Sequence, residues 1–147
     1  MIRPAVAADL PALVEMGAAF HGEAQWASDI AAFDPDTFAD LCVALNEHGV
    51  LLVADIEGDA VGMIGGGFLP AWFNRASHVA QELFLYVRPE HRRGAGARLM
   101  LKMIDECRAR GATTLFASAI ANGSPDVDDI YRRLGFAPTE RAYSKVL

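Results

Sequence analysis

Apolar residues recur along the chain with two different periods, and the change of period marks the predicted elements. Apolar spacings of three and four residues over 10–20, and again over 38–45, are typical of amphipathic helices. Largely apolar runs at 50–56 and 60–69 indicate strands, and the intervening Glu57-Gly58-Asp59 predicts that they form a β-hairpin.

The remaining elements follow from the same pattern and from turn residues. Asp9 is a natural N-cap, Gly65–Gly67 predict a bulge or a close backbone approach, and Gly135 predicts a left-handed helix end. Residues 21–33 are expected to form a loop or a short helix, and residues 70–75 a connecting loop. In chain order we predict a strand at 1–5, helices at 10–20 and from Asp34-Pro35 to near Gly49, strands at 50–56, 60–69 and up to Val87, a long helix to about Arg110, a strand at 114–120, a short helix at 127–134, and one or two strands within 136–147. This order predicts an α+β fold with helices covering a central sheet.

Composition narrows the class of protein. A chain of 147 residues, with 52% hydrophobic and 22% charged residues, predicts one globular domain over residues 1–147. No apolar run approaches the roughly 18 residues of a membrane span, and acidic residues and prolines interrupt any N-terminal signal-peptide core. Two cysteines are too few for a disulfide framework, so we expect free thiols and a cytoplasmic location.

Charge is distributed unevenly. Residues 1–87 hold two basic and twelve acidic residues, whereas residues 88–110 hold seven basic and three acidic ones. An acidic protein with one basic segment is unlike a general nucleic-acid binder. The pattern indicates a local anion site in an acidic body, although the acids also serve as ordinary solubilising surface.

The basic segment coincides with a strand-to-helix turn. The apolar strand Leu83–Val87 ends before Pro89, and His91-Arg92-Arg93 then leads through Gly94-Ala95-Gly96-Ala97 into a helix. The first amides of a helix lack internal partners and attract anions, and small residues let a phosphate approach them. A pyrophosphate cradle is predicted, the alternative being a glycine-tolerant turn with solvated arginines. A dinucleotide fingerprint would need a small residue at Leu99, and no P-loop pattern occurs.

Two motifs carry a resemblance to a family. Val87-Arg88-Pro89 followed by Gly94 and Gly96 resembles the acyl-CoA-binding motif of the GNAT superfamily of N-acetyltransferases, and Tyr131 with Leu134-Gly135-Phe136 resembles its closing signature. The resemblance implies a mixed, mostly antiparallel sheet flanked by about four helices, with acetyl-CoA as co-substrate and no metal. The donor-binding residues that it implies are Leu85, Tyr86, Val87, Arg92, Arg93, Gly94, Ala95, Gly96, Ala97 and Ser124.

The chain departs from the family pattern at two of these positions. His91 stands where Arg or Gln is usual, so which of His91, Arg92 and Arg93 meets the pyrophosphate stays open. Ser124 stands where many relatives carry asparagine, and a serine hydroxyl still forms hydrogen bonds.

The resemblance also implies two catalytic residues. Tyr131 matches a tyrosine that protonates the departing thiolate, although its apolar helical neighbours are equally typical of a core tyrosine. Glu82 is the candidate general base, directly or through a water chain, and the alternative is a solvated strand end. In a regular strand Glu82, Phe84 and Tyr86 share one face. His78 is a second candidate base.

We therefore expect an N-acetyltransferase that acts by direct attack in a ternary complex; the alternative is a catalytically idle acyl-CoA-binding or partner-binding domain. The expected partners are an amine on a small molecule or a protein and, as an option, a second copy of the chain, but neither nucleic acid nor a membrane. Acidic residues together with Trp26, Phe33, Trp72 and Phe73 favour a cationic acceptor with an apolar body, in a cleft that these aromatics would wall.

Overall fold

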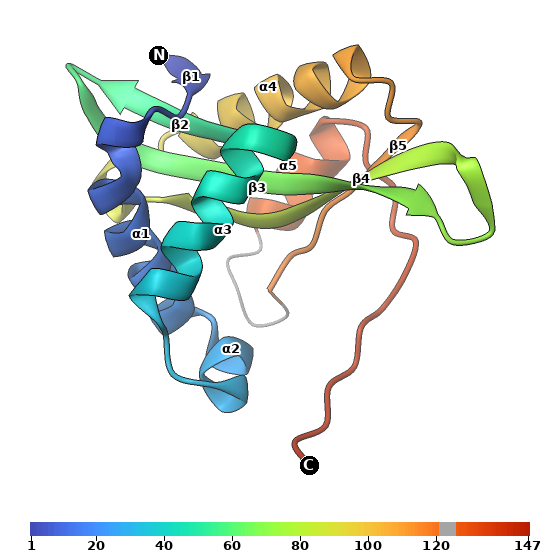
Figure 1. The fold of residues 1–147 in the computed structure, drawn as a ribbon, viewed down its shortest axis with the longest axis horizontal. Helices are drawn as coiled ribbons and strands as arrows, with labels where there is room; N and C mark the ends of the chain where they lie inside the picture. The colour runs from blue at the N-terminus through green and yellow to red at the C-terminus, as the bar shows by residue number, and fades with distance from the viewer. Residues whose placement is uncertain (121–125) are drawn as a thin grey trace.

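One sheet organises the computed structural model, which describes residues 1–120 and 126–147 (Figure 1). Within these residues the sheet has five strands in the order β1-β2-β3-β4-β5. Their bounds are β1 Ile2–Pro4, β2 Val50–Ile56, β3 Asp59–Ala71, β4 Asn74–Val87 and β5 Thr114–Phe116. Neighbouring strands are antiparallel except β4 and β5, which are parallel. The predicted mixed, mostly antiparallel sheet is confirmed.

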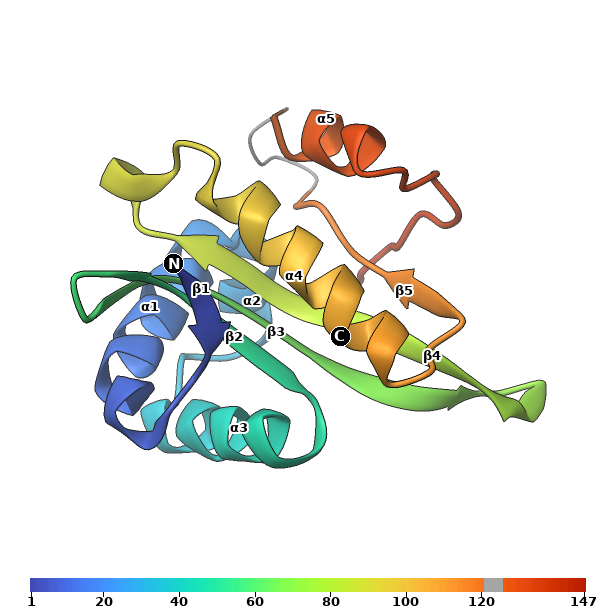
Figure 2. The same cartoon turned by 90° about the horizontal axis from the view of Figure 1, so that it is seen from above.

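Helices cover both faces of this sheet (Figure 2). The helices are α1 Leu10–Glu23, α2 Gln25–Ile30, α3 Pro35–His48, α4 Ala95–Ala109 and α5 Asp126–Arg133, with short 3-10 turns η1 Ala7–Asp9 and η2 Pro89–His91. On one face α1 and α3 build a core with Leu13, Met16 and Cys42. On the other face α4 builds a second core that includes Leu99, Met103 and Tyr131 of α5. The sheet is thus buried between two apolar layers.

Local chemistry explains the element boundaries that the sequence predicted. Pro35 occupies the first turn of α3, and the carboxylate of Asp34 accepts from the amide of Asp36 at 3.3 Å. The β2–β3 hairpin turns through Glu57 and Gly58, both with positive φ. Gly135, with φ 86°, follows α5 as the predicted left-handed residue.

Three predictions about local structure were wrong, and one was correct only in part. Asp9 occupies the predicted N-cap position of α1, but its side chain does not cap that helix; its carboxylate accepts from the amide of Val6 at 2.8 Å and pairs with Arg3. The predicted loop at 70–75 is mostly strand, because β3 and β4 continue pairing almost to the tip of their hairpin. The predicted strand at 114–120 ends at Phe116, and residues 136–147 contain no strand in the structure.

The absence of a strand in 136–147 agrees with the exposure of this segment. Phe136 still packs on the core, but Tyr143 is 90% exposed and Val146 74% exposed, so the end of the chain buries little apolar surface. Figure 1 shows this segment running away from the sheet toward the C-terminus. Within the described residues, no helix combines the length and the apolar character needed to cross a membrane.

Candidate active site

The site begins where β4 and β5 part. β5 pairs with β4 only between Thr114–Phe116 and Val79–Gln81, after which β4 continues to Val87. From Glu82 onward this edge of β4 therefore has no strand beside it among the described residues. Backbone groups at such an edge are available to an incoming ligand.

A β-bulge lies at the same point of β4. Gly65 of β3 pairs with Phe84, whereas the next residue, Gly66, pairs with Glu82, so Leu83 is an extra residue on β4. Leu83 is 48% exposed, although its apolar neighbours predicted it to be buried. An alanine methyl at Gly65 would clash with the Phe84 ring, which explains the glycine. The predicted bulge at Gly65–Gly67 is confirmed.

The bulge changes which side chains of β4 share a face. Ala80 belongs to the core on the α4 side, but Phe84 and Tyr86 belong to the core beneath α1 and α3. The predicted common face of Glu82, Phe84 and Tyr86 is therefore wrong. The extra residue reverses the alternation, so Glu82 lies on the α4 side with Ala80.

Glu82 is a buried carboxyl group with one defined backbone donor. Its side chain is 6% exposed, and its Oε2 accepts from the amide of Ser118 at 3.1 Å. Burial raises the pKa of Glu82 to about 7, and the hydrogen bond from Ser118 opposes that shift only partly. A solvated strand end, the alternative interpretation of Glu82, does not describe this environment.

Tyr131, from α5, binds the backbone of the same residue, Ser118. Its hydroxyl donates to the carbonyl of Ser118 at 3.2 Å, and its ring packs against Phe136 with centroids 5.2 Å apart. Burial, and secondly the charge of Glu82, raise the pKa of Tyr131, so the phenol stays protonated. Ser118 therefore joins the two predicted catalytic residues. Sequence analysis missed Ser118 because only its backbone takes part, and no side-chain pattern reports that.

The predicted anion cradle has the expected backbone geometry. Gly94, with φ 78°, precedes α4, and the amide of Arg98 donates to its carbonyl at 3.2 Å as the first helical bond. The amides of residues 95–97 come before that bond and have no helical acceptor. A methyl group at Gly96 would lie 4.0 Å from Leu85 of β4, at the limit of ordinary contact, so the helix start faces β4 with room to spare. Amides, a left-handed glycine and small side chains fit a phosphate group.

The basic side chains of the turn are not equivalent. Arg92 donates from Nε to the carbonyl of Val87 at 2.9 Å and pairs with Glu23 of α1 at 2.8 Å. Its guanidinium also lies 5.6 Å from the centre of the Tyr86 ring. Arg93 is exposed, and His91 lies 3.9 Å from Glu90. Arg92 is thus directed toward α1.

The other predicted site residues divide into three groups. Leu85 and Val87 point to the α4 side, whereas the Tyr86 side chain points to α1, so only its backbone faces the open edge. Ser124 lies outside the described residues. His78 is exposed and four residues before Glu82 on β4.

The aromatic residues do not form one wall. Trp72 and Phe73 are 93% and 75% exposed at the tip of the β3–β4 hairpin, which projects away from α2 and Trp26 (Figure 1). Phe33 instead packs on the ring of Phe38, with centroids 5.6 Å apart. The expectation that these four aromatics wall a single acceptor cleft is wrong.

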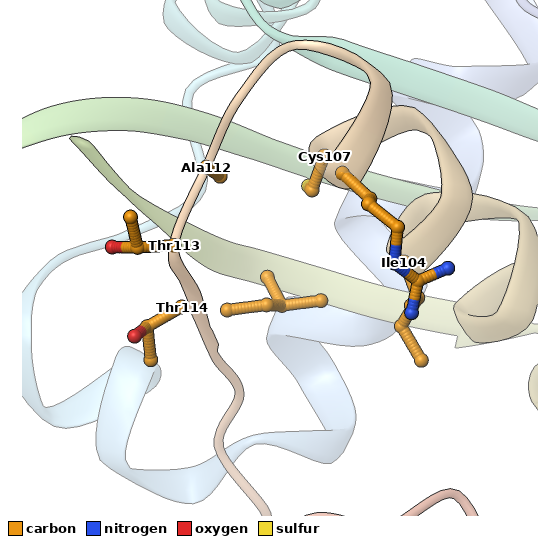
Figure 3. A pocket seen from close by; sticks show the side chains of 7 residues that line it. Ile104, Cys107, Ala112, Thr113 and Thr114 are labelled. Carbon is orange, nitrogen blue, oxygen red and sulfur yellow. The ribbon is translucent and has the colours of Figure 1, made fainter. Parts of the chain in front are cut away.

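A separate cavity of about 150 Å³ lies between the end of α4 and β5 (Figure 3). Ile104, Cys107 and Leu115 contribute its apolar lining, and Arg108 and Thr113 its polar lining. Burial raises the pKa of the Cys107 thiol, which keeps it protonated and unreactive. Neither Glu82 nor Tyr131 lines this cavity. Over the side chains that the structure describes, those of residues 1–120 and 127–147, no three His, Cys, Asp or Glu side chains gather as metal ligands would.

Comparisons with known proteins agree with this geometry. A family model described as the acetyltransferase (GNAT) family matches residues 16–136. The chain is 30% identical to a ribosomal-protein-alanine N-acetyltransferase from Brucella melitensis, over 92% of this chain and 83% of that one, with a TM-score of 0.74. An acetyltransferase from Trypanosoma brucei is 19% identical, over 100% and 99% of the two chains, with a TM-score of 0.74. An aminoglycoside acetyltransferase from an uncultured soil metagenomic sample is 19% identical, over 100% and 97%, with a TM-score of 0.73.

Proposed function

Because the chain belongs to the GNAT acetyltransferase family, we propose that it transfers the acetyl group of acetyl-CoA to a primary amine by direct attack in a ternary complex. The observation that carries the proposal is that Glu82 and Tyr131 bind the amide and the carbonyl of the same residue, Ser118, at the point where β4 and β5 part. A buried carboxyl group and a buried phenol at one open strand edge are suited to moving two protons.

Glu82 is proposed as the general base. An amine acceptor binds as its ammonium ion at neutral pH and must lose a proton before its nitrogen attacks. A carboxyl group with a pKa of about 7 is partly ionised at that pH and accepts this proton, directly or through one water. Because Glu82 is buried, water does not occupy its carboxylate oxygens, which stay available to accept the proton.

Tyr131 is proposed as the general acid. Acetyl-CoA supplies the acetyl group as a thioester; the new C–N bond forms while the C–S bond breaks, and the sulfur leaves with the electron pair. The phenol, which is held protonated, gives its proton to that sulfur. The charge of Glu82 raises the pKa of Tyr131, so protonation of Glu82 by the amine makes Tyr131 a stronger acid. The two proton transfers thereby favour each other.

The donor is proposed to lie along the open edge of β4, with its diphosphate at the amides of residues 95–97. Leu85, Tyr86 and Val87 would contribute backbone groups from that edge. Arg93 is exposed beside the cradle and is the proposed side-chain contact to the phosphates.

The acceptor is proposed to be a cationic amine, carried by a small molecule or by the amino terminus of a protein. The twelve acidic residues of 1–87 favour a cation, and exposed Trp26 on α2 offers an apolar contact. The 30% identity to the ribosomal-protein-alanine N-acetyltransferase supports including a protein α-amine.

The test measures acetyl-CoA affinity by calorimetry and thiol release in the presence of an amine panel. The panel contains an alanine-initiated peptide, an aminoglycoside, a polyamine and a neutral amine. We expect acetyl-CoA binding, turnover with one of the cations, and an acceptor KM that rises with salt, because the Debye length is about 10 Å at 0.1 M.

A variant with Glu82→Gln and Tyr131→Phe is the matched control, expected to bind acetyl-CoA without turnover. Absence of acetyl-CoA binding by the wild type would contradict the proposal. Binding without turnover on an extended panel would favour the alternative of a catalytically idle acyl-CoA-binding domain, which the fold also allows.

A further inference from the structure

Arg92 links three parts of the chain that are far apart in sequence. Its Nε donates to the carbonyl of Val87, the last residue of β4, at 2.9 Å. One terminal nitrogen donates to both carboxylate oxygens of Glu23, the last residue of α1, at 2.8 and 2.9 Å. The guanidinium lies over the buried ring of Tyr86, 5.6 Å from its centre.

These contacts restrain the turn that opens α4. Within the turn, the amide of Gly94 donates to the carbonyl of Arg92 at 2.7 Å, so the position of Arg92 is transmitted to the left-handed glycine at the cradle. The other bonds that hold the turn are local: the amide of His91 donates to Arg88, and that of Arg92 to Pro89. The contact with Glu23 therefore ties the cradle to a helix on the opposite face of the sheet.

We propose that Arg92 does not bind acetyl-CoA itself but positions the turn that does. Glu23 anchors the Arg92 side chain in the orientation that this role requires. This inference rests on the proposed function. Amides at a helix start bind a phosphate well only when they already point at it, because ordering them on binding costs free energy. Glu23 keeps the Arg92 charge turned toward α1, and the Val87 carbonyl fixes the other end of the guanidinium.

The opposite model makes a different prediction. If Arg92 were a phosphate ligand, Glu23 would compete with the diphosphate for the same guanidinium, and loss of the Glu23 charge would tighten acetyl-CoA binding. If Arg92 positions the turn, loss of that charge weakens binding. The sign of the change therefore separates the two roles.

The experiment measures acetyl-CoA Kd by calorimetry for the wild type, Glu23→Gln, Glu23→Asp, Arg92→Gln and the Glu23→Gln/Arg92→Gln double variant. Both groups of the pair are about half exposed, with side chains 49% and 48% accessible. We therefore expect Glu23→Gln to raise the Kd about three- to fivefold, the range for a partly exposed ion pair. Glu23→Asp, which keeps the charge, should lose less, and the double variant should bind no more weakly than Arg92→Gln alone. Turnover at saturating acetyl-CoA should stay within about twofold of wild type.

Glu15→Gln is the matched control. Glu15 lies on the same helix and pairs with the side chain of Arg88 at 3.0 Å, whereas the turn uses the backbone carbonyl of Arg88. Loss of the Glu15 charge should therefore leave the acetyl-CoA Kd unchanged. Thermal melts of all variants detect a purely structural effect, which would lower Tm without changing the Kd.

Unchanged or tighter binding by Glu23→Gln would overturn the inference, as would additive effects of the two single substitutions. Failure of the wild type to bind acetyl-CoA would instead refute the proposed function and remove the inference with it. The two failures are distinguished by the wild-type titration alone.

Discussion

Replacement of Glu82 by glutamine tests the buried carboxyl group without changing its shape. The glutamine carbonyl can still accept from the Ser118 amide, which donates to Glu82 at 3.1 Å, so the packing between β4 and residue 118 should survive. Only the ionisation is removed. The structure then predicts a pH-dependent difference in stability between the two proteins.

The sign and size of this difference follow from the two pKa values of Glu82. Burial raises the pKa from 4.5 to about 7, so the folded state holds its proton over a pH range in which the unfolded state has lost it. Below pH 4.5 the group contributes no penalty; stability falls as pH rises toward 7 and is constant above it. One pKa unit corresponds to about 1.4 kcal/mol, so the rise from 4.5 to about 7 lowers the free energy of unfolding above pH 7 by about 3 kcal/mol.

Urea denaturation at pH 4 and pH 8 measures this penalty. Relative to Glu82→Gln, the wild type should lose about 3 kcal/mol of unfolding free energy between the two pH values. Glu47→Gln is the control, because Glu47 is 62% exposed on α3 and stays hydrated in both states. Parallel pH dependences of wild type and Glu82→Gln would refute the argument that Glu82 is buried and uncompensated. In the kinetic assay, the rising limb of kcat/KM near pH 7 should disappear in the variant.

Three further predictions concern neighbouring parts of the site. Tyr131→Phe should lower turnover about 10²- to 10⁴-fold with acetyl-CoA affinity nearly intact, and wild-type turnover would assign Tyr131 to the core alone. Gly94→Ala should weaken acetyl-CoA binding in calorimetry through strain at φ 78°, whereas Gly111→Ala, at φ 80° beyond the other end of α4, should cost similar stability without affecting binding. Leu83→Ala keeps the bulge and shortens only a half-exposed side chain, so thiol release should stay near that of the wild type; a large loss would implicate the Leu83 side chain in the site.

Much of the fold was predictable because burial imposes its period on the sequence. The apolar stripes of α1, α3 and α4 and the largely apolar runs of β2 and β3 report directly which side chains leave water. The boundaries at Pro35, Gly58 and Gly135 were also predictable, because each depends on the backbone conformation that the residue itself prefers. These predictions needed no knowledge of distant contacts.

The errors arose where distant contacts decide the outcome. Asp9 fits the sequence of a helix cap, but the guanidinium of Arg3 and the amide of Val6 take its carboxylate. The ion pair of Arg92 was likewise not predictable, because its partner Glu23 lies 69 residues earlier. No periodicity reports such a pair, because a charged residue on a surface turn has many equally suitable partners.

The bulge at Leu83 shows how one such detail organises the whole site. In a regular strand, Ala80 and Glu82 would share the α4 face with Phe84 and Tyr86, whereas Leu85 would point to α1. The extra residue instead turns Leu85 to the α4 side, where it meets the start of α4 at Gly96. Glu82 and Leu85, which faces the proposed donor cradle at Gly96, therefore lie on the same face of the sheet only because of the bulge. The same reversal sends Tyr86 to the other face, beneath the guanidinium of Arg92. One inserted residue thus places the proposed base, the proposed cradle and the tie of that cradle to α1 in their relative positions.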